Sequence, residues 1–375
     1  MSEVLAEHIG YLSLSGRRAL YERAIAQIVE KGDIVADLGC GVGVLGLQCL
    51  AAGAGRVYGI DSSAAVHHAR ETAKRSGLSD RYICVASSTF DAVLPELVDV
   101  LICDHIGFFG FDYGIVEMMR DAAARMLKPG GRIIPDRLNL QVAAASSEEC
   151  RSIAAAWSQE NVPDELRWLD HLARNSRHPH QFKPDEIVSA VADLGEIELG
   201  ENSRDLYSFS AELEITQAGR FDGLAGWFDA HLGADVWMTN SPLETRSIGR
   251  PKAFLPVAKP FDVAPGDRIG VKLRTRSEGT LIFWTIKPPG DAPAQEMSTW
   301  ESTILSQDDL HELGDIPPTL TDKAKVNVAI LSMVDGSRTP REIEDAILAA
   351  YPDLYPTPER TREHVREIIS WNIVK

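Results

Sequence analysis

The sequence predicts an α/β fold, in which a parallel, doubly wound sheet is followed by a β-barrel-like domain and a small helical module. Three observations predict this order. Short apolar runs alternate with amphipathic stretches up to about residue 135, alternating strands recur between residues 206 and 286, and helical periodicity returns after residue 320. A chain of 375 residues is also long enough for two or three domains.

Five apolar runs are expected to form the parallel sheet. An amphipathic segment at about residues 15–31 precedes them, and a Lys-Pro-Gly-Gly turn at 128–131 precedes the last run. Because helices connect the runs, the strands should lie parallel, with ligands at their carboxyl ends, as in Rossmann-like domains. The expected strands are Ile34–Asp37, Val57–Asp61, Tyr82–Ala86, Val98–Cys103 and Arg132–Pro135.

The middle of the chain is expected to be rich in strands. Leu138–Ala144 has a strand pattern, residues 147–195 look helical, and residues 206–286 alternate between turn signals. This spacing is typical of a small barrel or sandwich. Proline-rich stretches at 288–290 and 317–318 predict a linker.

The last segment carries a helix-start signal of its own. Thr339 can cap a helix, Pro340 suits its first turn, and Glu342 completes a capping box. Three short amphipathic helices predict a helical or winged-helix module. The expected domains are residues 1–136, 137–315 and 316–375.

Composition narrows the class of function. The net charge of −17 argues against a nucleic-acid partner, which needs a basic face. The five cysteines lack C-x-x-C spacing, so we expect reduced core cysteines and no metal site. No apolar run approaches the roughly 20 residues of a membrane span, and no signal peptide opens the chain. These observations favour a cytoplasmic protein.

The turn after the first strand is the strongest indication of function. Gly39, Gly41 and Gly43 allow a sharp turn and the close approach of a ligand. The second strand ends at Asp61, whose carboxylate can accept both ribose hydroxyls of an adenosyl ligand. The glycine spacing also fits a dinucleotide site, but Asp37 would repel a pyrophosphate and suits a sulfonium or an α-amino group. The turn resembles motif I of class I methyltransferases and predicts S-adenosyl-L-methionine as cofactor.

Several further blocks resemble the protein arginine methyltransferases over about residues 5–290. The blocks are the N-terminal helix, the strand and loop at 94–108, the segment 127–137, and the change into a β-rich domain. The resemblance implies that Arg17 pairs with the methionine carboxylate, because a guanidinium matches a carboxylate bidentately. With His8 nearby and Phe90 as a stacking partner for adenine, the predicted cofactor-binding residues are His8, Arg17, Asp37, Gly39, Gly41, Gly43, Asp61 and Phe90.

The acceptor loop departs from the family pattern. The resembled enzymes clamp a guanidinium between two glutamates, of which the first maps onto Asp104 and the second near Asp112 and Tyr113. Their Thr-His-Trp loop maps onto Ser247–Arg250, which lacks both the His and the Trp. One carboxylate holds a guanidinium less well than two, so the pocket is expected to be incomplete or rebuilt.

The same loop supplies the predicted catalytic residues. Asp104 could orient a cationic or N–H acceptor, and His105 could accept its proton. Tyr113 is expected to complete the catalytic set, while Asp112 and Phe108 bind the substrate and exclude water. Ordinary core packing remains an alternative for Phe108, and a structural hydrogen bond remains one for His105.

We therefore expect a methyltransferase that N-methylates a peptide or an amino-acid-like natural-product precursor. The alternatives are a protein arginine methyltransferase with a rearranged clamp, or a non-catalytic scaffold that retains the fold. Residues 330–343 weakly resemble the PqqD-type modules that recognise leader peptides, so the C-terminal module could recognise a peptide. The family resemblance also implies a homodimer formed through a helical arm at about residues 150–185.

Overall fold

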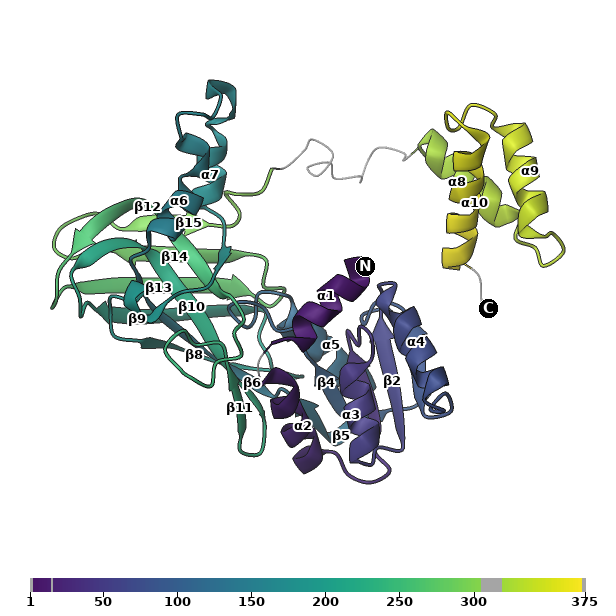
Figure 1. Ribbon diagram of the computed structural model, residues 1–375, viewed down its shortest axis with the longest axis horizontal. Helices are drawn as coiled ribbons and strands as arrows, with labels where there is room; N and C mark the ends of the chain where they lie inside the picture. The colour runs from purple at the N-terminus through teal and green to yellow at the C-terminus, as the bar shows by residue number, and fades with distance from the viewer. Residues whose placement is uncertain (1–2, 15, 305–318, 373–375) are drawn as a thin grey trace. The chain divides into compact units, whose positions relative to one another are not determined.

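The computed structural model describes residues 3–14, 16–304 and 319–372 (Figure 1). The chain divides into two compact units, residues 1–304 and residues 305–375. The predicted linker prolines at 317–318 lie outside the described residues. No helix in the described ranges is long and apolar enough to cross a lipid bilayer.

The first unit begins with the predicted parallel sheet, whose strand order is β3-β2-β1-β4-β5. All four strand pairs are parallel. The last strand starts at Leu127 and includes the predicted turn, so it is longer than the sequence indicated. The strands are β1 Ile34–Leu38, β2 Arg56–Asp61, β3 Tyr82–Ala86, β4 Val98–Cys103 and β5 Leu127–Ile134.

The central position of β1 in this sheet brings three acidic residues to one edge. Because β1 lies between β2 and β4, the chain leaves Asp37, Asp61 and Asp104 at neighbouring carboxyl ends. Two helices precede the sheet, and three connect consecutive strands of it. These helices are α1 Glu3–Leu12, α2 Arg17–Ile28, α3 Val44–Ala52, α4 Ala65–Arg75 and α5 Ile115–Met126.

The β-rich part of the first unit consists of two antiparallel sheets, as predicted. One sheet has the order β7-β12-β10-β6-β8 with β11 paired to β10, and the other has the order β15-β14-β13-β9. Helix α2 also contacts β10 and β11, which joins this part to the parallel sheet. The strands are β6 Arg137–Ala145, β7 His178–His180, β8 Ala192–Glu198, β9 Leu206–Glu214, β10 Gly219–Gly233, β11 Val236–Thr239, β12 Lys252–Val263, β13 Arg268–Arg276, β14 Ile282–Lys287 and β15 Gln295–Ser298.

The segment 147–195 is less helical than the sequence predicted. It contains the short helices α6 Glu148–Ala154 and α7 Leu169–Arg174, which project beyond the strands in Figure 1. The strands β7 and β8 follow. Pro179 lies within β7, which pairs with β12, and a proline in that position is incompatible with a helix interior.

The second unit is a bundle of three helices with its own apolar core. The predicted capping box is present: the Thr339 N–H donates to Glu342 Oε2 (2.7 Å) and the Glu342 N–H donates to Thr339 Oγ1 (3.3 Å). Residues 319–372 contain helices and no strand. Of the two predicted forms, a helical module and a winged-helix module, they therefore match the helical one. The helices are α8 Asp322–Ser332, α9 Pro340–Ala350 and α10 Pro358–Asn372, and the core is Val326, Ile330, Ile343, Ile347, Val365 and Ile369.

Candidate cofactor and acceptor pocket

A pocket of about 340 Å³ lies at the carboxyl ends of β1, β2 and β4, beneath α1 and α2. It brings together most of the residues that the sequence singled out, although these residues are far apart along the chain. Its lining is Glu7, His8, Tyr11, Leu12, Arg17, Arg18, Tyr21, Asp37, Gly39, Cys40, Gly41, Val42, Val44, Leu45, Asp61, Ser62, Ser63, Asp104, His105, Ile106, Tyr113 and Arg250.

The glycine turn permits a close approach between α1 and the sheet. Gly41 has a φ of 53°, and a Cβ there would lie 2.4 Å from Nε2 of His8. Any other residue would therefore displace His8 from the turn. Gly43 also has a positive φ of 92°, but it caps α3 and does not line the pocket.

Asp61 fixes the turn while it faces the pocket. Its Oδ2 accepts a hydrogen bond from the Gly41 N–H (2.8 Å), and its Oδ1 accepts one from the Ser63 N–H (2.7 Å). A carboxylate has about four lone-pair sites, so these two bonds leave acceptor capacity for a ribose. The position therefore suits the role that the sequence predicted for Asp61.

Asp37 is the most deeply buried acid of the pocket, with 1 % of its surface exposed. Its Oδ2 accepts hydrogen bonds from the Gly46 N–H (2.9 Å) and the Tyr82 hydroxyl (3.4 Å). Burial raises the pKa of Asp37 to about 7, because removing the carboxylate from water disfavours its charge. A cation bound beside Asp37 would favour the ionised form.

Arg17 and Asp104 form an ion pair inside the pocket. The Arg17 Nε–H donates to Asp104 Oδ1 (3.1 Å) and Nη2 donates to the Asp104 backbone carbonyl (3.1 Å). The side chain of Arg17 is only 7 % exposed, and Asp104 raises its pKa against the opposing effect of burial. The residue predicted for the cofactor and the residue predicted for the acceptor thus contact each other directly.

His105 and Tyr113 face each other across the acceptor side, with ring centroids 5.9 Å apart. Burial lowers the pKa of His105 below its usual 6.5, so the imidazole is neutral at pH 7 and can accept a proton. Burial raises the pKa of Tyr113 above 10, so its hydroxyl remains protonated. Both side chains line the pocket, in agreement with the position predicted for a catalytic set.

Three other predicted site residues do not line this pocket. The Asp112 side chain is fully buried, where it pairs with Arg177 and accepts a hydrogen bond from the Phe109 N–H (2.8 Å). These bonds stabilise the acceptor loop on the side that faces away from the pocket. Phe108 packs against Tyr113 with centroids 5.4 Å apart, and Phe90 is 45 % exposed outside the pocket.

Arg250 is a charged pocket residue for which the sequence predicted no role. Its side chain is 5 % exposed and its guanidinium carbon lies 5.4 Å from the ring centroid of Phe108 and 5.5 Å from that of Tyr113. Burial and Arg17 lower its pKa from the usual 12.5. The available signal was its position in the segment predicted to correspond to the Thr-His-Trp loop, but only the fold brings that segment to residues 104–113.

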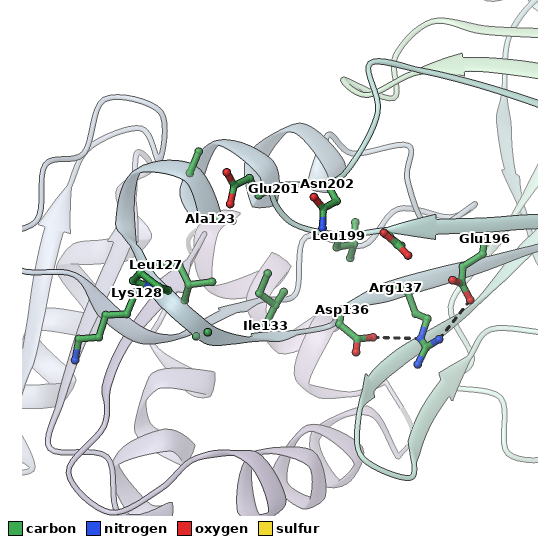
Figure 2. A pocket seen from close by; sticks show the side chains of 15 residues that line it. Ala123, Leu127, Lys128, Ile133, Asp136, Arg137, Glu196, Leu199, Glu201 and Asn202 are labelled. Carbon is green, nitrogen blue, oxygen red and sulfur yellow. Dashed lines mark ion pairs between the residues drawn. The ribbon is translucent and has the colours of Figure 1, made fainter.

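A second pocket of about 580 Å³ lies between α5, β5, β6 and β8. Figure 2 shows Arg137 between Asp136 and Glu196, with an ion pair to each. None of the residues predicted to bind cofactor or acceptor lines it. Within the described ranges there is no cluster of three or more histidine, cysteine or acidic side chains arranged for a metal ion.

Comparison with known proteins agrees with this geometry. A family model described as "Ribosomal protein L11 methyltransferase (PrmA)" matches residues 19–141. "Probable protein arginine N-methyltransferase 6.2" of Oryza sativa subsp. indica is 34% identical over 319 residues, which cover 81% of this chain and 72% of that protein. The chain belongs to the protein arginine N-methyltransferase family.

Two further relatives extend the comparison. "Probable protein arginine N-methyltransferase 6" of Arabidopsis thaliana is 38% identical over 304 residues, which cover 77% of this chain and 65% of that protein. The chain thus spans slightly less than two thirds of the Arabidopsis relative. "Arginine N(omega)-methyltransferase" of Streptomyces achromogenes subsp. streptozoticus is 25% identical over 273 residues, which cover 71% of this chain and 75% of that protein.

Solved structures confirm the fold. The Trypanosoma brucei PRMT1 enzyme-prozyme heterotetrameric complex with AdoHcy has a TM-score of 0.68 at 21% identity, covering 78% of this chain and 97% of that chain. Arabidopsis thaliana protein arginine methyltransferase 10 has a TM-score of 0.63 at 21% identity, covering 77% of this chain and 96% of that chain. The predicted combination of a Rossmann-like and a β-barrel-like domain is therefore confirmed.

Membership of the protein arginine N-methyltransferase family also confirms S-adenosylmethionine as the cofactor. The pocket suits this molecule: the positive-φ turn leaves backbone space, Asp61 can accept hydrogen bonds from hydroxyl groups, and Asp37 places a carboxylate where a cationic group could bind. The roles of the individual residues stay predictions.

The raised pKa of Asp37 predicts that cofactor binding depends on pH. The free carboxyl is partly protonated below about pH 7 and must ionise beside a sulfonium or ammonium group. Affinity for S-adenosylmethionine should therefore rise between pH 6 and pH 8, by up to about tenfold per unit below the pKa. Isothermal titration calorimetry at pH 6 in buffers of different ionisation enthalpy should detect the released proton.

The matched variant is Asp37→Asn, which should lose this pH dependence and weaken binding about 10–100-fold, by the loss of one buried charge contact. The affinity for S-adenosylhomocysteine, which lacks the sulfonium charge, should rise less between pH 6 and pH 8. Equal affinities of the unaltered protein at pH 6 and pH 8 would contradict a role for Asp37 beside the cationic end.

Proposed function

We propose that this chain is an S-adenosylmethionine-dependent N-methyltransferase whose acceptor is an amino-acid-like small molecule, as in natural-product biosynthesis. The observation that supports this acceptor is the charge of the acceptor loop. Asp104 faces the pocket, whereas the side chain of Asp112 is buried beneath the loop against Arg177. A pocket with one loop carboxylate and the additional cation Arg250 is poorly suited to clamp a protein guanidinium.

The relative from Streptomyces, named as an arginine N(omega)-methyltransferase, supports arginine itself as a first candidate acceptor. A second candidate function is protein arginine methylation with a rearranged clamp. The names of the rice and Arabidopsis relatives favour it. The two functions differ in whether the acceptor is free or part of a polypeptide.

The chain's residues can carry out each requirement of methyl transfer. When bound, the cofactor supplies an electrophilic methyl group. Arg17 occupies one side of the Asp104 carboxylate and leaves further lone pairs to orient an acceptor N–H. As the nitrogen takes the methyl group, the sulfonium sulfur would keep the electron pair of the broken carbon–sulfur bond, and His105 would accept the proton that the nitrogen loses. Tyr113, which packs against Phe108 behind the pocket, excludes water and so removes a competing nucleophile.

Asp104 provides the direct test of this site. Asp104→Asn removes the charge but keeps the shape, and it should lower kcat/KM about 10²–10⁴-fold, as expected when an acceptor loses its orienting group. The measurement is methyl transfer from labelled S-adenosylmethionine to L-arginine and to an arginine-rich peptide. Asp80→Ala, an exposed carboxylate outside the pocket, is the control.

Full turnover by Asp104→Asn would refute the assigned acceptor pocket. Binding of S-adenosylmethionine without methyl transfer to any nitrogen acceptor would instead support the non-catalytic scaffold. Faster turnover of the peptide than of L-arginine would favour the protein-directed alternative.

Removal of the second unit separates a small acceptor from a peptide held by its leader. Residues 305–375 have their own core, so residues 1–304 should fold without them. We expect turnover of L-arginine by the shortened chain to stay within about twofold, because the pocket lies wholly within residues 7–250. If the shortened chain turns over the natural substrate much more slowly than the full chain does, peptide recognition by the C-terminal unit is supported.

We also propose that the chain forms a homodimer through the helical arm at about residues 150–185, which includes α6 and α7. Three large apolar side chains are exposed there, Trp157 at 39 %, Leu166 at 41 % and Trp168 at 55 %. Clusters of exposed aromatic and aliphatic side chains are typical of interaction surfaces. A cytoplasmic location likewise stays a prediction.

The dimer prediction is tested by placing charge on the arm. Leu166→Glu combined with Trp168→Glu should convert a dimer into a monomer, because burying two unpaired carboxylates would weaken association at least about 100-fold. Light scattering after size-exclusion chromatography measures the mass. Val93→Glu, an exposed apolar residue elsewhere, is the control, and a dimer that persists in the double variant would contradict the arm interface.

A further inference from the structure

We propose that Arg250 binds a carboxylate inside the pocket, and that this carboxylate belongs to the acceptor. The acceptor would then be an α-amino acid or another small molecule with a free carboxylate. This inference rests on the proposed methyl transfer, since it specifies the substrate of the same pocket.

The first support is a buried guanidinium with an unpaired Nε–H. Arg250 is 5 % exposed, and its Nε–H is buried without a hydrogen-bond partner in the described part of the chain. A guanidinium carries five N–H donors, and buried donors of native proteins are almost always paired. Because Arg250 also lines the pocket, a bound ligand can supply the missing acceptor.

The second support is how the cation is held in place. Its guanidinium carbon lies 5.7 Å from the ring centroid of Tyr11, 5.4 Å from that of Phe108 and 5.5 Å from that of Tyr113. Aromatic faces stabilise a cation, but they do not accept its N–H groups in the plane of the guanidinium. The rings therefore orient Arg250 without satisfying its donors.

The third support is that Arg250 has no ion-pair partner of its own. Arg17 is paired with Asp104, and Arg177 is paired with Asp112. Arg250 lies near both pairs, and among the described residues it has no carboxylate within ion-pair distance. A bound carboxylate matches a guanidinium in shape and would neutralise the charge of Arg250.

Two carboxylates could reach this position, that of the acceptor and that of the cofactor's methionine end. Phe108 and Tyr113 belong to the acceptor loop, which favours the acceptor. Tyr11, however, also lies 5.2 Å from the guanidinium carbon of Arg17, the predicted partner of the cofactor carboxylate. The experiment must therefore measure both ligands.

The test variants are Arg250→Met, which removes the charge, and Arg250→Lys, which keeps the charge but loses the planar fork. Arg246→Met is the matched control, since Arg246 is an exposed arginine of the same loop. Calorimetry measures the binding of S-adenosylmethionine and of its decarboxylated analogue. It also measures L-arginine and L-argininamide binding to protein saturated with S-adenosylhomocysteine.

We expect the unaltered protein to bind L-arginine at least about tenfold more tightly than L-argininamide. Arg250→Met should abolish this preference and Arg250→Lys should retain part of it, with the Kd for S-adenosylmethionine unchanged within about twofold. If Arg250→Met instead weakens the binding of S-adenosylmethionine but not that of its decarboxylated analogue, the carboxylate at Arg250 is the cofactor's and the assignment to the acceptor is overturned.

The proposal is overturned if Arg250→Met changes neither preference, or if L-arginine fails to bind and cofactor binding is unaffected. Failure of the proposed function is a separate result. Carboxylate-dependent binding without methyl transfer would support the Arg250 site and refute the proposed methyltransferase activity. Methyl transfer that does not change in the Arg250 variants would support the activity and refute the Arg250 site.

Discussion

The contact on which the pocket depends is the ion pair between Arg17 and Asp104. It joins the start of α2 to the residue that follows β4, and so connects the N-terminal helices to the carboxyl edge of the sheet. The hydroxyl of Tyr21, one turn further along α2, donates to the carbonyl of Cys103 (3.0 Å) and reinforces the same connection. Buried ions require partners, so neither member of the pair can be lost without a cost to the other.

The pocket lining also carries charges of both signs outside this pair. Asp37 and Asp61 place carboxylates at the ends of β1 and β2, which suits a cationic ligand. Arg250 adds a positive charge among aromatic rings. Charges of both signs in one pocket suit the proposed reaction, because the sulfonium donor is cationic and the proposed acceptor carries a carboxylate.

The sequence predicted the cofactor half more completely than the acceptor half. Gly39, Gly41, Asp37 and Asp61 lie within one strand-helix-strand unit, so local spacing was enough to identify them. The same pattern placed Asp104 at a third strand end. Arg250 could not be found in this way, because only the packing of two domains brings it to the site.

The spacing of residues along the sequence also could not predict which side chains are buried. Asp112 and Tyr113 are adjacent in the acceptor loop, yet one points beneath the loop and the other into the pocket. Phe90 follows a strand end at the position typical of an adenine contact, but its side chain is exposed elsewhere. The helical segment expected at 147–195 does not extend through residues 178–180, where Pro179 lies within β7.

Arg250 reaches the pocket from the loop before β12, while the other lining residues, from Glu7 to Tyr113, belong to the first part of the chain. If Arg250 contacts the acceptor as proposed, changes in that one loop could alter which acceptor is taken while residues 7–113 of the pocket stay the same. Such an arrangement would let specificity diverge in evolution without a change in the glycine turn or the acidic strand ends.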